Sequence, residues 1–169
     1  VYYTLPTTFL GNDTDPGVNP TIAPGAATTT VGTFNLKTNT GTDTVTNATT
    51  TLSAGSSGGL FGVEITNSGN TTIYCSSYNP SSDVVGLIGC NLPVTSASTT
   101  FNIRIKPKTH AAMPAPPGST YSVTATITAI TATNSTSGTD TTSDTVTIDN
   151  ASPNGATATS GTAGDAIPP

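Results

Sequence analysis

The chain has 169 residues, a length that fits one domain, and only 8% of them are charged, against about 25% in an ordinary soluble domain. Its net charge of −5 argues against nucleic-acid binding, because phosphate recognition needs clustered Lys and Arg. Thr supplies roughly a quarter of the sequence, and its branched Cβ favours extended backbone over helix. Composition therefore predicts an all-β protein.

No stretch of the sequence is apolar for the 18 or so residues that a membrane-spanning helix requires. The first residue, Val1, is not Met, which is typical of a mature chain after removal of an export leader. We therefore expect a secreted protein, extracellular or at a cell surface, without membrane insertion.

The N-terminal part divides into an arm and a linker. Residues 1–10 alternate apolar and polar side chains, which predicts a strand-like arm interrupted by Pro6. Residues 11–27 are rich in Pro and Gly and are expected to form a linker. The apolar parity of the arm consists of Val1, Tyr3, Leu5 and Phe9.

The body of the chain is expected to span residues 28–150, followed by a low-complexity tail over 151–169. About seven alternating segments with turn residues between them predict an antiparallel two-sheet sandwich, and a closed barrel is the structural alternative. Residues 61–65 and 121–129 alternate most regularly. The parity predicts a core that contains Phe101, Ile103, Ile105, Tyr121, Val123, Ile127, Val146 and Ile148, and places Arg104, Lys106, Thr124 and Thr126 outside it.

The two cysteines, Cys75 and Cys90, stand fifteen residues apart in a segment rich in Ser, Gly and Asn. For an exported chain they predict one disulfide, worth about 3 kcal/mol in the loop-entropy model. The alternative is two free thiols in a reducing compartment. A structural zinc site is not expected, because His110 is the single histidine and carboxylates would have to complete the ligand set.

Catalytic signals are missing from the sequence. His110 lies in a Pro-rich loop, Glu64 is the only glutamate, and no nucleophile elbow, phosphate loop or metalloprotease motif is present. A glutamate-based glycosidase pair is therefore impossible. We expect a protein that is not an enzyme, with no catalytic residues and no cofactor.

Three weaker patterns are compatible with binding or modification. Asp13 and Asp15 resemble a fragment of a calcium site, although Asp in such a linker is more often part of a turn. Arg104, Lys106 and Lys108 share one parity and form either a solvated strand face or a docking stripe for an acidic neighbour. The Asn-x-Ser/Thr rule marks five candidate N-glycosylation sites, at Asn12, Asn47, Asn70, Asn134 and Asn150.

Two stretches carry a resemblance to a known family. TTSDTVTIDNASP, which ends at Pro153, resembles the closing strand and exit linker of Ig-like or fibronectin-III-like repeats in bacterial surface proteins. PAPPGSTYSVTATIT is similar to the approach into the F-type strand of such modules, with Tyr121 near the strand start. The resemblance covers roughly residues 94–153. It implies a sandwich with a structural or adhesive role.

Two functions remain open. The first is a subunit of an extracellular filament or pilus, in which the arm adds as a strand to a neighbouring copy and buries Tyr3, Leu5 and Phe9 there. In the alternative arrangement the arm folds back as the first strand of its own sandwich. The second function is an adhesin or carbohydrate-binding module, for which Tyr74 and Tyr78 are the best aromatic candidates. The expected partners are accordingly other copies of the chain, and glycans under the second reading.

Overall fold

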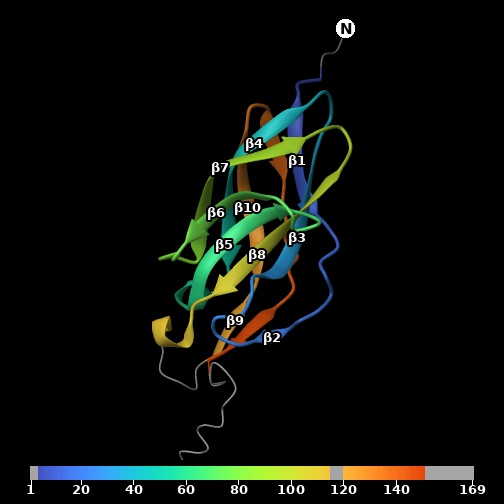
Figure 1. The fold of residues 1–169 in the computed structure, drawn as a ribbon. Helices are drawn as coiled ribbons and strands as arrows, with labels where there is room; N and C mark the ends of the chain where they lie inside the picture. The colour runs from blue at the N-terminus through green and yellow to red at the C-terminus, as the bar shows by residue number, and fades with distance from the viewer. Residues whose placement is uncertain (1–3, 115–119, 151–169) are drawn as a thin grey trace, which may run out of the picture.

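The computed structural model describes residues 4–114 and 120–150, which form an elongated all-β sandwich (Figure 1). One layer is a six-stranded sheet of order β11-β1-β3-β8-β5-β6. The sheet β10-β4-β7 packs against it, and the sheet β2-β12-β9 extends the second layer at one end of the molecule. The strands are β1 (Thr7–Asn12), β2 (Thr21–Ile22), β3 (Thr29–Thr38), β4 (Asp43–Leu52), β5 (Leu60–Asn67), β6 (Ile73–Tyr78), β7 (Val84–Val94), β8 (Thr99–Pro107), β9 (Thr120–Val123), β10 (Ala125–Ala132), β11 (Ser135–Gly138) and β12 (Val146–Asp149), with 3-10 turns η1 (Ser56–Gly59) and η2 (His110–Ala112).

The core lies between the two layers and confirms the predicted parity. Seven of the eight expected core residues are at most 1% exposed, and Tyr121 is half-buried against the cluster. Thr124, Thr126 and Arg104 are half-exposed and Lys106 is exposed, as predicted. The hydrophobic alternation of the body strands therefore specifies which side of each strand faces inward.

The regular-looking segment 121–129 departs from simple alternation in two ways. The expected strand 121–129 divides at Thr124, so that β9 pairs with β12 and β10 pairs with β4. Thr124 bonds instead to Ser53, whose Oγ accepts from the Thr124 amide over 3.0 Å. A β-bulge between Ile127 and Ala129 then turns Ala129 outward, where the alternation had placed it inside.

The predicted disulfide between Cys75 and Cys90 is confirmed. Cys75 lies on β6, an edge of the six-stranded sheet, and Cys90 lies on β7, an edge of the opposite sheet. Their Cα atoms are 4.6 Å apart, and both side chains are buried. The cross-link therefore fastens the two layers to each other along one side of the sandwich.

Candidate functional site

β1 occupies a slot in the six-stranded sheet between two strands that do not pair with each other. It runs antiparallel to β3, with Leu10 opposite Leu36, and parallel to β11, with Leu10 opposite Gly138. Gly138 has a φ of +89°, and a Cβ at this position would lie 2.0 Å from the carbonyl oxygen of Leu10. Glycine is therefore required where β11 meets β1.

The position of β1 corrects two expectations about the arm. Thr7–Asn12 pairs within its own chain, which is the fold-back arrangement, and the segment predicted as a linker contains β2. The inward parity is also the opposite one: Thr8 and Leu10 are buried, whereas Phe9 is half-buried and Leu5 is 75% exposed. Pairing with β3 and β11 fixes the register of β1, and the register determines which of its side chains face inward. Val1 and Tyr3 lie outside the described residues.

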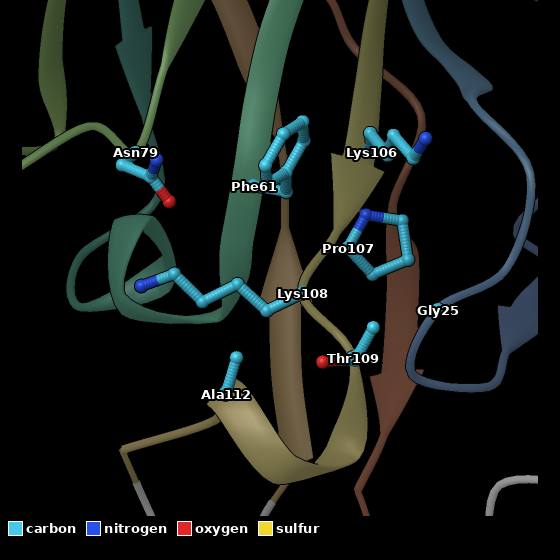
Figure 2. A pocket seen from close by; sticks show the side chains of 8 residues that line it. All are labelled: Gly25, Phe61, Asn79, Lys106, Pro107, Lys108, Thr109 and Ala112. Carbon is cyan, nitrogen blue, oxygen red and sulfur yellow. The ribbon is translucent and has the colours of Figure 1, made fainter.

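A hollow of about 470 Å³ opens beside the C-terminal end of β8 (Figure 2). Phe61 of β5 and Lys106 of β8 form its upper part, and Lys108 extends across it toward the η1 turn. Within the described part of the chain its lining includes two lysines and no carboxylate; the residues are Gly25, Phe61, Asn79, Lys106, Pro107, Lys108, Thr109 and Ala112. The hollow is therefore a partly apolar, cationic site.

Phe61 reaches this site because a bulge changes the parity of β5. Phe61 shares the sequence parity of Val63 and Ile65, but the register shifts between Leu60 and Gly62. Leu60 is fully buried in its place, and Phe61 is 39% exposed. Its ring lies 5.5 Å from that of Tyr78, which is 61% exposed. The sequence signal for this bulge is the cluster of glycines around it, since glycine often marks a bulged strand.

The three residues of the predicted docking stripe have different roles. Arg104 forms an ion pair with Glu64, with 2.9 Å between Nη1 and Oε1, and also donates to the carbonyl of Thr28. The Lys106 ammonium lies 5.5 Å from the centre of the Phe61 ring. Lys108, beyond the end of β8, donates to the carbonyl of Gly58 over 3.0 Å. The structure therefore brings Lys106 and Lys108 to one site and leaves Arg104 neutralised within the sheet.

The two tyrosines considered for sugar binding lie in different environments. Tyr74 packs against the core, with its ring edge-on to Phe101 at 5.6 Å, whereas Tyr78 remains at the surface. His110 lies beside Asn150, with 3.3 Å between Nε2 and the carbonyl oxygen.

Acidic side chains mostly accept hydrogen bonds from the chain's own backbone. The Asp83 carboxylate accepts from the amides of Gly55 and Ser57, and the Asp144 carboxylate accepts from that of Gly17. The two Asp residues considered for calcium also accept from the chain itself: Asp13 accepts from the Thr14 amide and the Thr100 hydroxyl, and Asp15 accepts from the Thr33 amide over 2.7 Å. No cluster of three or more metal-ligating side chains occurs within residues 4–114 and 120–150.

These contacts shift the acidities of three carboxyl groups. Hydrogen bonds from Ser57 and Gly55 lower the pKa of Asp83. At Asp43 partial burial raises the pKa, but bonds from Thr8 and from three backbone amides outweigh it and lower the pKa overall. Burial raises the pKa of Asp140 to about 6, against a bond from the Ile127 amide and with a smaller contribution from the charge of Asp15.

The five candidate glycosylation sites differ in accessibility. Asn12 and Asn70 are exposed, although both amide atoms of Asn12 are hydrogen-bonded to Thr141. Asn47 is half-buried and accepts from the Gly89 amide. The side-chain nitrogen of Asn134 is buried, and Asn150 is buried entirely, so a glycan at either position would require the local structure to open. Asn70 is the most favourable of the five. It lies at an exposed hairpin tip, and the two hydrogen bonds that it accepts use Oδ1, whereas a glycan would be attached to Nδ2.

No protein-family model matches this sequence, and comparison with curated proteins finds no significant match. Within the described part of the chain, no helix has the length and hydropathy needed to cross a membrane. Any functional assignment must therefore come from the sandwich, its filled slot and its cationic hollow.

Proposed function

We infer that this chain is a non-catalytic structural module of an extracellular or cell-surface assembly, related in architecture to Ig-like repeats. Copies of it join by exchanging β1. An exported location is supported by the disulfide, which persists in oxidising compartments, and by a surface kept polar with Thr instead of charge. A non-catalytic role is supported by the engagement of the carboxylates in hydrogen bonds with the chain's own amides and hydroxyls.

The observation that carries the proposal is the slot that β1 fills. Without β1, the long strand β3 would expose an unpaired edge, and β11 would lose its hydrogen-bonding partner in the sheet. A strand of the same sequence from another copy would restore both sets of hydrogen bonds, which is the chemistry of strand complementation. Because the contacts are identical, the exchange itself requires no new interface.

The buried side chains specify the register of the incoming strand. Leu10 is 4% exposed and belongs to the core, and burial of such a side chain contributes about 1.5–3 kcal/mol. Thr8 is fully buried, and its hydroxyl donates to the Asp43 carboxylate over 2.5 Å. A shift by one residue would place Phe9 inside and Leu10 outside, so the slot accepts one register.

The segment after β1 confines the hinge for such an exchange. Asp15 is hydrogen-bonded to Thr33, the amides of Gly17 and Val18 are held by Asp144, and β2 pairs with β12. Asp13 is also attached, through the Thr100 hydroxyl of β8, so the chain is held to its own domain from Asp13 onward and the hinge lies close to Asn12. A short hinge favours exchange between copies, because a strand that detaches cannot easily rearrange within its own domain.

A pair of engineered cysteines tests the exchange. Phe9 and Lys37 are opposite each other on β1 and β3, and neither side chain is in the core. Oxidation of the double variant Phe9→Cys, Lys37→Cys should give a ladder of covalent multimers in denaturing gels without reductant, because the paired strands belong to different copies. A single monomeric band would refute the exchange. The matched control is Thr51→Cys, Val84→Cys, which joins β4 to β7 and should remain a monomer in either case.

A further inference from the structure

The hollow beside Phe61 has no role in strand exchange, because β3 and β8 separate β5 from β1. Its volume is about 470 Å³, and its lining combines one aromatic ring, two lysines and the polar side chains of Asn79 and Thr109. A concave, largely apolar surface with a few convergent polar groups is the usual form of a small-ligand site. The question is which ligand chemistry these groups select.

The charge of the site selects an anion. The molecule carries a net charge of −5 and four basic residues. Arg104 is neutralised by Glu64, whereas Lys106 and Lys108 both line the hollow. Since residues 4–114 and 120–150 contribute no carboxylate to the lining, the hollow is a cationic spot on an acidic molecule. Such a site attracts an anionic group.

The aromatic rings add a preference for a ligand with an apolar face. Tyr78 is not one of the residues that line the hollow, but it contacts Phe61, which is: both are exposed, and their ring centres lie 5.5 Å apart at a tilt of 51°. Lys106 extends over the same Phe61 ring, so a cation and an aromatic face are presented side by side. A pyranose ring offers C–H groups that pack on an aromatic face, and a carboxylate on that ring would meet the ammonium group.

Every acidic side chain in residues 4–114 and 120–150 already has a partner within the chain. This favours an anion from a different molecule over a second copy of this chain. We propose that this hollow binds a carboxylated sugar unit of an acidic polysaccharide, with the pyranose ring on Phe61 and Tyr78 and the carboxylate at Lys106.

Titration calorimetry of the full chain with hexagalacturonic acid tests the proposal directly. The wild-type protein should bind this oligomer, and added salt should weaken the binding because the contact is ionic. The fully methyl-esterified hexamer, which lacks the negative charges, should not bind. Absence of binding by hexagalacturonic acid, or equal binding of the esterified form, would overturn the proposal.

Three variants locate the site. Lys106→Gln should weaken binding about tenfold, since it removes a charge-assisted contact. Tyr78→Ala should weaken it about fivefold through loss of the stacking surface. The matched control is Lys37→Gln, because Lys37 is an exposed lysine on β3 of the same sheet and lies outside the hollow; its affinity should be unchanged. Equal losses in Lys106→Gln and Lys37→Gln would indicate nonspecific attraction and refute the site.

A hexaglutamate peptide distinguishes the two classes of acidic partner. It carries comparable negative charge but no sugar ring, so it should bind at least tenfold more weakly than the oligosaccharide. Equal or tighter binding of the peptide would overturn the assignment to a sugar and identify the hollow as a site for acidic protein segments.

Discussion

The two long sides of the sandwich are closed by different chemistry. At one side β6 and β7 are edge strands of opposite sheets, and the Cys75–Cys90 disulfide joins them. At the other side the chain crosses from β10 to β11, and hydrogen bonds connect residues 12–19 and 140–145 to each other and to β3 and β10. We call this second closure the polar seam.

The polar seam consists mainly of side chains that bond to backbone groups. The Ser143 hydroxyl accepts from the Ala125 amide of β10 and donates to the Val31 carbonyl of β3, each over 2.9 Å, and so bridges the two layers. The remaining contacts join Asn12 to Thr141, Asp15 to Thr33, Asp140 to Ile127, Asp144 to Gly17 and Val18, and Asn19 to Thr145. One side therefore has a covalent cross-link, and the other is closed by many hydrogen bonds, some of them to carboxylates that can be protonated.

Removing the disulfide should have the largest effect. The variant Cys75→Ala, Cys90→Ala should lose about 3 kcal/mol of unfolding free energy, because the cross-link no longer restricts the unfolded chain. Urea denaturation followed by circular dichroism measures this loss. Wild-type protein in reductant should match the variant, which separates the effect of the cross-link from that of the two missing sulfur atoms. Unchanged stability in both would mean that the packed layers hold this side without the bond.

Breaking the polar seam at Ser143 should cost less. Ser143→Ala leaves the amide of Ala125, a fully buried residue, without its acceptor, and we expect a loss of about 1–3 kcal/mol. The same urea denaturation applies. Ser98→Ala is the control, since Ser98 is exposed in the turn between β7 and β8, and its substitution should change little. If Ser143→Ala loses no more unfolding free energy than Ser98→Ala, then water replaces the Ser143 bridge.

The two sides also differ in how far the sequence predicts them. The disulfide follows from composition, because a chain with two cysteines has one possible intramolecular pairing. The polar seam does not, because this chain offers many Asp, Asn, Ser and Thr residues and alternation gives no information about which of them meet. The Asp13-Thr14-Asp15 segment illustrates the problem: its spacing resembled a metal site, yet its carboxylates bond to Thr100 and Thr33.

Strand alternation in the sequence predicts the core well and the surface site poorly. Alternation correctly placed Ile103, Ile105 and Val123 inside, because the pairing of β8 with β5 and of β9 with β12 continues without a register shift at these residues. Phe61 and Ala129 share the parity of buried neighbours in the sequence but are exposed, and each is next to a bulge. A bulge depends on the partner strand as well as on the strand that carries it. The parity of Phe61 in the sequence therefore does not indicate that it lines the hollow.

The smallest expected effect is a pH-dependent one within the polar seam. Asp140 is 3% exposed; its Oδ2 accepts from the Ile127 amide, and its buried Oδ1 has no hydrogen-bond partner. Its pKa in the folded state is about 6, above the ordinary value of 3.8. Between these two pH values the unfolded chain has lost the proton that the folded chain keeps. Stability contributed by this group therefore falls as the pH rises from about 4 to about 6.

The variant Asp140→Asn should not show this decrease in stability with rising pH. The amide keeps an oxygen for Ile127 and carries no charge, so the variant should unfold at a higher temperature than the wild type above pH 6. The expected gain is about 2–4 °C, the shift that accompanies roughly 1 kcal/mol in a domain of this size. Below pH 4 both side chains are neutral, and the difference should disappear. Melting curves from pH 3.5 to 8 measure this difference in unfolding temperature. The disulfide variant is the comparison: its loss of stability should be the same at every pH, because no titrating group is involved. A constant difference between Asp140→Asn and wild type over the whole range would show that the carboxyl group is not protonated in the folded chain, and that the polar seam is as insensitive to pH as the covalent side.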